Sequence, residues 1–339
     1  MSLSQNKKTI LSISLFIVIF AILLVIATFF DLQISKILTK ISLPEGQYIT
    51  NDPFAATVEI FATIPAPLFI GIGFLFIFIY CKRFLTGKKS KALMILSMLL
   101  ATVAFVYMIS DIFKYLIRHI TLNELSDTSG FYLYIVYLIF ALPIEGFVYL
   151  LIKNTPDDVV KNMLKLTLVV VIVVALTTII INLGVKNIFG RIRYRAMNMD
   201  RDDPNYGFAA YMRWYEIKGK WITKEEMEAM WSTHDAIKSF PSGHTASAGT
   251  TYALITLPTI LNRKDDKKLN ILMYVISILW TGICAIGRIA AGAHFMSDTL
   301  FGGTLSFVIV VLLKEFYIDK GEHIKALFKK ESSFEKVVE

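Results

Sequence analysis

Four residues suited to holding an anion stand together where a polar loop meets an apolar stretch, in the order Pro241, Ser242, Gly243 and His244. Ser is a favoured helix N-cap, and Gly lets the backbone approach a ligand closely. A helix N-terminus offers unpaired N–H groups and a partial positive charge, and a histidine can add a proton donor near neutral pH. The tetrapeptide therefore favours an anion site, although a helix cap with an incidental histidine would explain Ser242 alone.

A second cluster contains a histidine and a carboxylate spaced for one helix face. His294 and Asp298 stand at i and i+4, and Arg288 ends the apolar stretch that precedes them. A carboxylate there can accept the imidazole N–H, fix its tautomer and make the other ring nitrogen a better nucleophile. A structural His–Asp pair is the alternative, but an ionisable residue facing a bundle interior is a functional candidate by default.

A third cluster consists of two cations at the end of another apolar stretch. Lys186 and Arg193 are seven residues apart, which is about two turns if the helix continues past the bilayer. Both cations would then share one helix face and could hold an anion together. Ordinary interfacial anchoring by basic side chains is the alternative explanation.

These clusters need a scaffold, and the composition indicates a membrane protein. Hydrophobic residues make up 55% of the 339 residues and charged residues 18%, whereas a soluble chain carries about 25% charge. A bilayer-spanning helix needs about 20 mainly apolar residues, so we predict an all-α polytopic membrane helical bundle of about eight transmembrane helices. The predicted spans are Thr9 to Phe30, Phe61 to Cys81, Ala92 to Phe113, Phe131 to Ile152, Leu166 to Val185, His244 to Leu261, Ile271 to Arg288 and Phe295 to Leu313.

The distribution of basic residues predicts the orientation of the bundle. With both termini cytoplasmic, the cytoplasmic segments carry 20 of the 35 Lys and Arg residues, as the positive-inside rule requires. The first span should be retained, because its apolar run of about 21 residues is longer than a signal-peptide core. The net charge of +8 then reflects orientation rather than nucleic-acid binding. All three clusters fall on the extracytoplasmic side of a plasma or inner membrane.

The spans divide the chain into three predicted regions. Residues 1–91 hold additional N-terminal spans, residues 92–314 a six-helix core, and residues 315–339 a cytoplasmic tail. Glu145 lies inside the fourth span, where we expect it to bond a neighbouring helix.

A loop subdomain of residues 194–240 should stand outside the membrane between the fifth and sixth spans. Thr223 and Glu226 have the spacing of a capping box and predict the start of a short helix. Because the loop is rich in Trp and Tyr, it either lies along the outer leaflet and shapes the site entrance or forms a plain surface subdomain.

The three clusters, taken in order, resemble the motifs of the type 2 phosphatidic acid phosphatase superfamily. This superfamily includes membrane lipid phosphatases and soluble vanadium haloperoxidases, and the resemblance covers about Lys165 to Lys314. The Pro-Ser-Gly-His motif matches fully, whereas the other two motifs each depart at one position. Tyr194 stands where the first motif usually has Pro, and Gly287 replaces the Ser of the third. The matching residues of these two motifs are Lys186, Arg193, Arg288, His294 and Asp298.

The resemblance implies a role for each matching residue. His294 would attack phosphorus to form a phosphohistidine, Asp298 would orient His294, and His244 would protonate the leaving oxygen and then activate water. The phosphate-binding residues would be Lys186, Arg193, Ser242, Gly243 and Arg288. No metal and no other cofactor is expected, because cationic side chains would neutralise the phosphate.

The sequence thus predicts a metal-independent membrane lipid phosphatase. The candidate substrates are an isoprenyl diphosphate, phosphatidic acid and phosphatidylglycerol phosphate, and recycling of lipid carriers outside the cytoplasm would follow several bacterial members. A lipid phosphotransferase and a non-catalytic phospholipid transporter are the alternatives. A vanadate-dependent haloperoxidase fits the membrane composition poorly. The expected partners are the lipid phosphate and the bilayer, without nucleic acid, and the oligomeric state stays open.

Overall fold

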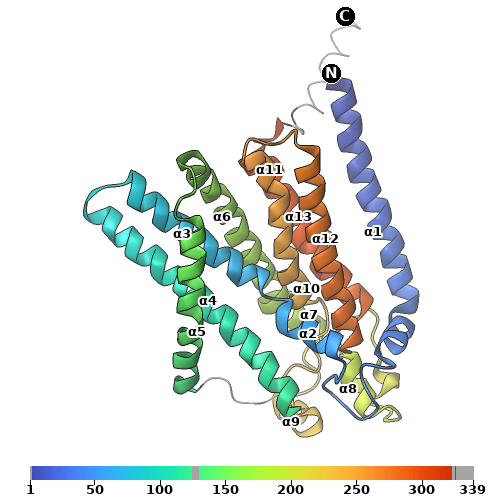
Figure 1. Ribbon diagram of the computed structural model, residues 1–339. Helices are drawn as coiled ribbons and strands as arrows, with labels where there is room; N and C mark the ends of the chain where they lie inside the picture. The colour runs from blue at the N-terminus through green and yellow to red at the C-terminus, as the bar shows by residue number, and fades with distance from the viewer. Residues whose placement is uncertain (1, 124–129, 323–324, 326–339) are drawn as a thin grey trace, which may run out of the picture.

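The computed structural model describes residues 2–123, 130–322 and 325, and over these residues the protein is helical without strands (Figure 1). The predicted all-α polytopic bundle is confirmed. The long helices are α1 (Ser2–Thr39), α3 (Pro65–Phe84), α4 (Gly87–Thr121), α5 (Phe131–Ile152), α6 (Asp157–Thr177), α12 (Lys267–Ala290) and α13 (Met296–Leu313). The short ones are α2 (Pro53–Phe61), η1 (Thr178–Val185), α7 (Lys186–Phe189), α8 (Tyr194–Met199), η2 (Phe208–Ala210), α9 (Lys224–Trp231), α10 (Gly243–Ala248), η3 (Gly249–Thr256), α11 (Leu257–Ile260) and η4 (Lys314–Ile318).

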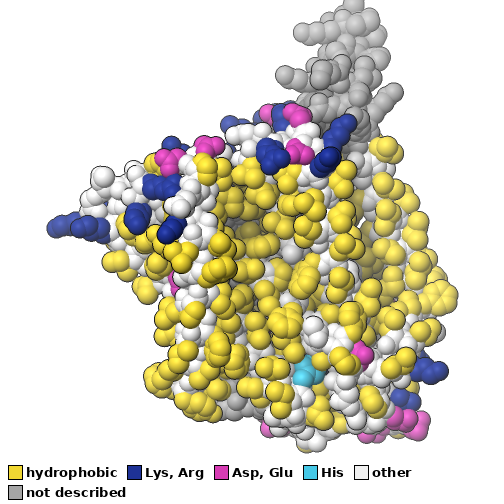
Figure 2. Space-filling view, in the orientation of Figure 1, with side chains coloured by type: hydrophobic (Ala, Val, Ile, Leu, Met, Phe, Trp, Pro, Cys, Tyr) yellow, Lys and Arg dark blue, Asp and Glu magenta, His cyan; other side chains and the backbone are white. Residues whose placement is uncertain are grey.

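Seven helical stretches of the described chain are long and apolar enough to cross a membrane, so the protein is a multi-pass membrane protein. They are Ile10–Thr39, Pro53–Phe84, Gly87–Thr121, Phe131–Ile152, Asp157–Phe189, Lys267–Ala290 and Met296–Ile318. Hydrophobic side chains cover the middle of the face in Figure 2, and charged side chains gather toward its two ends. This distribution is the one that a bilayer imposes on a helical bundle.

The sixth predicted span, His244 to Leu261, is helical but not one regular helix. It runs as α10, η3 and α11 in direct succession, and it packs against α3, α6, α12 and α13. Small and hydroxyl-bearing residues fill it, and Ser306 of α13 donates from its Oγ to the carbonyl of Ala246 at 2.8 Å. The stretch is thus an enclosed central element, and the predicted count of eight spans stays a prediction.

The second predicted span starts earlier than expected and is interrupted. Asp52 caps α2 by accepting a hydrogen bond from Ala55 N at 2.7 Å, and Pro53 occupies the first helical position. After a turn, Pro65 opens α3. The α2 segment packs on α12 and α4 rather than continuing a membrane-facing helix.

The fifth membrane helix ends before Arg193, so the prediction that Lys186 and Arg193 share a helix face is wrong. Helical structure continues from α6 through η1 and α7 and stops at Phe189. Gly190 then adopts a φ of +63°, a left-handed conformation that favours glycine and terminates the helix. The chain leaves in an extended segment that carries Arg193.

Residues 194–240 form a folded unit at the end of the bundle opposite the N-terminus (Figure 1). The predicted capping box is confirmed, since Thr223 and Glu226 exchange both hydrogen bonds at the start of α9. A hydrophobic cluster joins this unit to the connection between α1 and α2, with Trp231 and Met227 packed with Tyr48. The location of this unit relative to the membrane stays a prediction, and most of the predicted tail, residues 315–339, lies outside the described residues.

Candidate active site

The three motif segments meet at the end of the bundle that carries the folded loop. Ser242 caps α10, as predicted, by accepting from Thr245 N at 3.3 Å. Its own N–H donates to the carbonyl of Asp298 in the first turn of α13 at 2.9 Å, which ties the second motif to the third. A Cβ at residue 243 would lie 3.3 Å from Lys186 Nζ and 3.2 Å from Asn182 Oδ1. Gly243 therefore lets the first motif approach the second closely.

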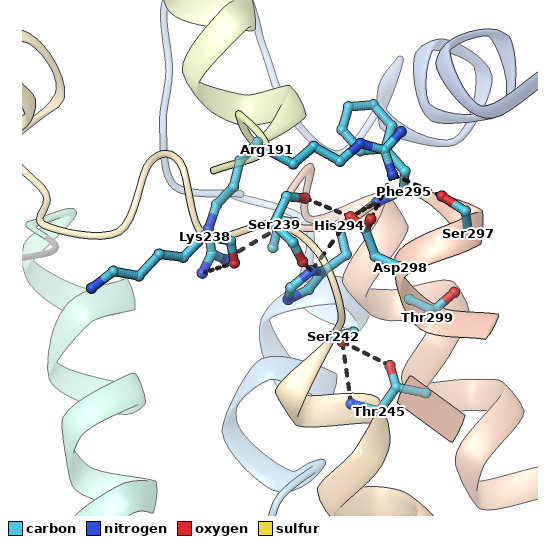
Figure 3. Close-up of polar contacts among 12 residues, drawn as sticks. Arg191, Lys238, Ser239, Ser242, Thr245, His294, Phe295, Ser297, Asp298 and Thr299 are labelled. Carbon is cyan, nitrogen blue, oxygen red and sulfur yellow. Dashed lines mark hydrogen bonds and ion pairs between the residues drawn. The ribbon is translucent and has the colours of Figure 1, made fainter. Parts of the chain in front are cut away.

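His294 is buried, and a backbone carbonyl determines its tautomer (Figure 3). Its Nδ1 lies 2.7 Å from the carbonyl oxygen of Ser239 and 3.7 Å from Oδ2 of Asp298. Because a carbonyl can only accept, Nδ1 carries the hydrogen and Nε2 keeps a free lone pair. The predicted hydrogen bond from the imidazole to Asp298 is therefore wrong, since the carbonyl of Ser239 takes that position.

Asp298 instead holds the segments on both sides of the imidazole. Its Oδ2 accepts from Ser239 Oγ at 2.5 Å and from Phe295 N at 2.8 Å, and its Oδ1 accepts from Arg191 Nη1 at 2.6 Å (Figure 3). Burial lowers the pKa of His294 to about 3, and the nearby cations Arg193 and Arg288 contribute. The imidazole is thus neutral at neutral pH, as a nitrogen nucleophile must be.

Arg191 is the main site residue that sequence reasoning missed. It is fully buried, and it donates to Asp298, to Ser297 Oγ at 2.7 Å and to Asp31 of α1 at 3.0 Å. Burial alone would lower the pKa of Arg191, but the carboxylates of Asp298 and Asp31 raise it. Two arginines, Arg191 and Arg193, are separated by one residue in this segment. Only Arg193 fitted the spacing from Lys186 that the first motif requires.

A carboxylate from the loop holds Arg193. Arg193 Nη2 donates to Asp235 Oδ2 at 2.8 Å, and Arg193 Nε donates to the Asp235 carbonyl at 2.9 Å. Burial opposes ionisation of Asp235, but Arg193 and Arg195 together hold its pKa well below the usual range. Sequence reasoning did not predict Asp235, because no helical spacing relates it to the arginines.

Arg288 also has a carboxylate partner, Glu59 of α2, and both side chains are buried. Glu59 contacts three further basic side chains, namely Arg195 at 3.4 Å, Arg118 at 3.8 Å and His119 at 3.0 Å. Glu59 lies in the region predicted to hold only additional spans.

One cavity of about 750 Å³ joins the cationic cluster to an apolar groove. Of the predicted site residues, Lys186, Arg193, Gly243, His244 and Arg288 line this cavity, whereas Ser242, His294 and Asp298 are buried and are not among its lining residues. The His244 ring packs edge-on against Tyr115 at 5.1 Å, and its Nε2 has no hydrogen-bond partner among the described residues. The apolar wall includes Ala66, Ile70, Phe74, Leu100, Val103 and Val174.

The described residues contain no group of three or more His, Cys, Asp or Glu side chains that could hold a metal ion. Glu145, the intramembrane carboxylate of α5, accepts from Thr102 of α4 at 2.8 Å. The expectation that it bonds a neighbouring helix is thus confirmed.

The fold and the site define a helical membrane protein with histidines and arginines gathered at one end of its bundle. Residues 163–322 match the family model of the PAP2 superfamily, which confirms that this part of the chain resembles the type 2 phosphatidic acid phosphatases. Phosphatidylglycerophosphatase B of Bacillus subtilis (strain 168) is 28% identical over 101 residues, which are 30% of this chain and 50% of that relative. The match thus spans about half the length of the relative. No solved structure matches the chain.

Proposed function

We propose that the protein is a membrane lipid phosphatase that releases phosphate through a phosphohistidine intermediate. The observation that carries the proposal is the cavity, in which cationic side chains at one end continue into an apolar groove. Along α4 the lining runs from Arg118 to Leu100, about 27 Å at the helical rise. A phosphorylated lipid has this distribution of charge and hydrocarbon, whereas a water-soluble phosphate ester would not need the apolar part.

Two displacements account for the reaction. In the first, His294 Nε2 attacks phosphorus, the bond from phosphorus to the lipid oxygen breaks, and His244 gives that oxygen a proton. In the second, His244 takes a proton from water, the water oxygen attacks phosphorus, and the bond from phosphorus to nitrogen breaks. Inorganic phosphate leaves, and both histidines return to their starting states.

The remaining site residues stabilise charge and geometry. Lys186, Arg193 and Arg288, with the Ser242 hydroxyl and the Gly243 N–H, would neutralise the phosphate oxygens as charge develops on them. Asp298 would act by holding Ser239 and Phe295 on either side of the nucleophile. In this scheme the charge stabilisation comes from side chains, and no metal takes part.

The substrate class and the orientation belong to the same proposal. Phosphatidylglycerol phosphate, phosphatidic acid and an isoprenyl diphosphate all carry phosphate at headgroup level, and the name of the Bacillus relative makes the first of them the one to test first. We place the site on the extracytoplasmic side, and we divide the chain into N-terminal spans 1–91, a core 92–314 and a tail 315–339.

Phosphate release from purified protein in detergent tests the function. The wild type should release inorganic phosphate from at least one of these lipids in EDTA, and His294→Ala should lose several orders of magnitude in kcat while eluting and unfolding like the wild type. A phosphotransferase would pass the phosphoryl group to an added alcohol instead of water. A transporter would bind the lipid without cleaving it, and either outcome would reject the hydrolase.

A further inference from the structure

Glu59 is a buried acidic residue at the site that lies outside the part of the chain matched to the PAP2 superfamily. It stands on α2, in the first part of the second membrane stretch, Pro53–Phe84, and its side chain is not exposed at all. A lone carboxylate is costly to bury, so its position requires compensation by positive charge.

The partners of Glu59 provide more positive charge than the carboxylate can neutralise. Arg288, Arg195 and Arg118 all lie within 4 Å of its Oε1, and His119 Nε2 lies 3.0 Å from its Oε2. The three arginines line the cavity, and Glu59 does not. The carboxylate thus holds the guanidinium groups from behind, and the excess positive charge remains on the cavity side.

A second observation, independent of the ion pairs, concerns Gly287, which departs from the motif. A Cβ at residue 287 would lie 2.5 Å from Val58 Cβ, closer than real Cβ atoms approach. The Gly at the position where the motif has Ser therefore makes room for α2 against α12. This packing brings Glu59, next to Val58, onto Arg288, next to Gly287.

We propose that Glu59 is a positioning residue that fixes Arg288, with Arg195 and Arg118, in the geometry that the phosphoryl group needs. The proposal rests on the proposed function, because it assigns Arg288 to the phosphate. Without Glu59 the three guanidinium groups would repel one another and move apart before substrate arrived. With it, their charges are arranged in advance, which is the condition under which electrostatic stabilisation of a transition state is effective.

The test compares Glu59→Gln and Glu59→Asp with the wild type, and Glu145→Gln is the matched control. Glu145 is also a buried intramembrane carboxylate, but it bonds Thr102, and its side chain does not line the cavity. We expect Glu59→Gln to lose on the order of 10²-fold in kcat, as for a catalytic group displaced by about 1 Å. Glu59→Asp should recover part of this loss, and Glu145→Gln should keep the wild-type kcat.

A second readout separates positioning from folding. Vanadate can adopt the five-coordinate geometry of the transition state, whereas inorganic phosphate resembles the product, so their ratio of inhibition constants reports transition-state fit. Glu59→Gln should bind vanadate at least tenfold less tightly relative to phosphate, whereas a partly unfolded enzyme would keep the wild-type ratio. If Glu59→Gln folds poorly, Gly287→Ala should show the same altered ratio, and the added Val58→Ala should restore it.

The results distinguish the two proposals. A Glu59→Gln enzyme with wild-type kcat and a wild-type ratio would overturn the positioning role and leave the phosphatase function intact. A wild type that releases no phosphate from any lipid would reject the phosphatase function. Stabilisation of the fold by vanadate, measured by thermal unfolding without turnover, would then still test Glu59: a loss of that stabilisation in Glu59→Gln supports the role, and equal stabilisation overturns it.

Discussion

Replacing Arg191 by Met should destabilise the fold and inactivate the enzyme together. Arg191 is buried between two carboxylates, Asp31 of α1 and Asp298 of α13, and it is the guanidinium group that contacts both. Met keeps most of the apolar volume of the side chain and removes the charge. The substitution therefore tests the electrostatic contact rather than the packing.

The expected magnitude follows from the burial of all three groups. Removing one partner of a buried ion pair costs about 3–5 kcal/mol, because the other partner stays buried without compensation. Here two carboxylates lose their counter-charge, so the upper part of that range applies. The unfolding temperature should fall by roughly 10 °C on the usual scaling for a domain of this size. Combining Arg191→Met with Asp31→Asn removes one of the two orphaned charges and should restore about half of the loss.

Intrinsic fluorescence during heating in detergent measures the stability, and phosphate release measures the activity. Arg213→Met is the matched control, because Arg213 lies exposed in the nearby loop of residues 194–240, where it bonds the Tyr215 hydroxyl at 2.7 Å. Its unfolding free energy should change by less than about 0.5 kcal/mol. If Arg191→Met unfolded at the wild-type temperature, the buried triad would not stabilise the protein, and our account of Asp298 would be wrong.

Two further predictions concern His294, the proposed nucleophile. The pKa of His294 is about 3 in the folded protein and 6.5 for a histidine side chain exposed to water, so the unfolded state gains a proton first as pH falls. The free energy of unfolding of the wild type should therefore fall by about 2 kcal/mol between pH 7 and pH 5, a loss that His294→Gln should not show. If thermal unfolding gave the same pH dependence of stability for both proteins, the pKa shift would be contradicted. Ser239→Ala keeps the carbonyl that fixes the imidazole of His294 but removes the hydroxyl bonded to Asp298. The kcat for phosphate release should therefore fall about tenfold. A change in kcat of less than about twofold would show that Asp298 acts without Ser239.

The sequence was sufficient for the parts of the fold that local composition determines. Runs of about 20 apolar residues must leave water, and seven of the predicted spans overlap helices able to cross a membrane. The capping box at Thr223 and the cap at Ser242 are equally local, and both are present. The end of the fifth helix at Gly190 was missed, because glycine inside an apolar helix and glycine at a helix end look alike in sequence.

The site could be predicted only where its residues follow a spacing. Lys186, Arg193, His244 and Arg288 belong to short motifs, and the motif order identified them, whereas Arg118 and Arg195 line the same cavity outside any motif. Asp31 and Glu59 follow no spacing relative to the site, since they contact residues 160 and 229 positions away in the chain. Each also stands at the end of an apolar stretch, where an acidic residue usually faces water. Their roles depend on tertiary packing, which no local pattern contains.

Each arginine of the site is held by a carboxylate from a distant segment, and this arrangement has a physical reason. Arg191 has Asp31 and Asp298, Arg193 has Asp235, and Arg288 has Glu59. A guanidinium keeps its charge when buried, so it needs an anionic partner whether or not substrate is bound. Lys186 differs, because within the described residues no carboxylate lies within 4 Å of its Nζ, although it lines the same cavity. An ammonium group can tolerate this where a guanidinium cannot, since it can release its proton when buried. The arginines therefore form the fixed framework of the site, and Lys186 is the cation whose charge an arriving phosphate would stabilise most.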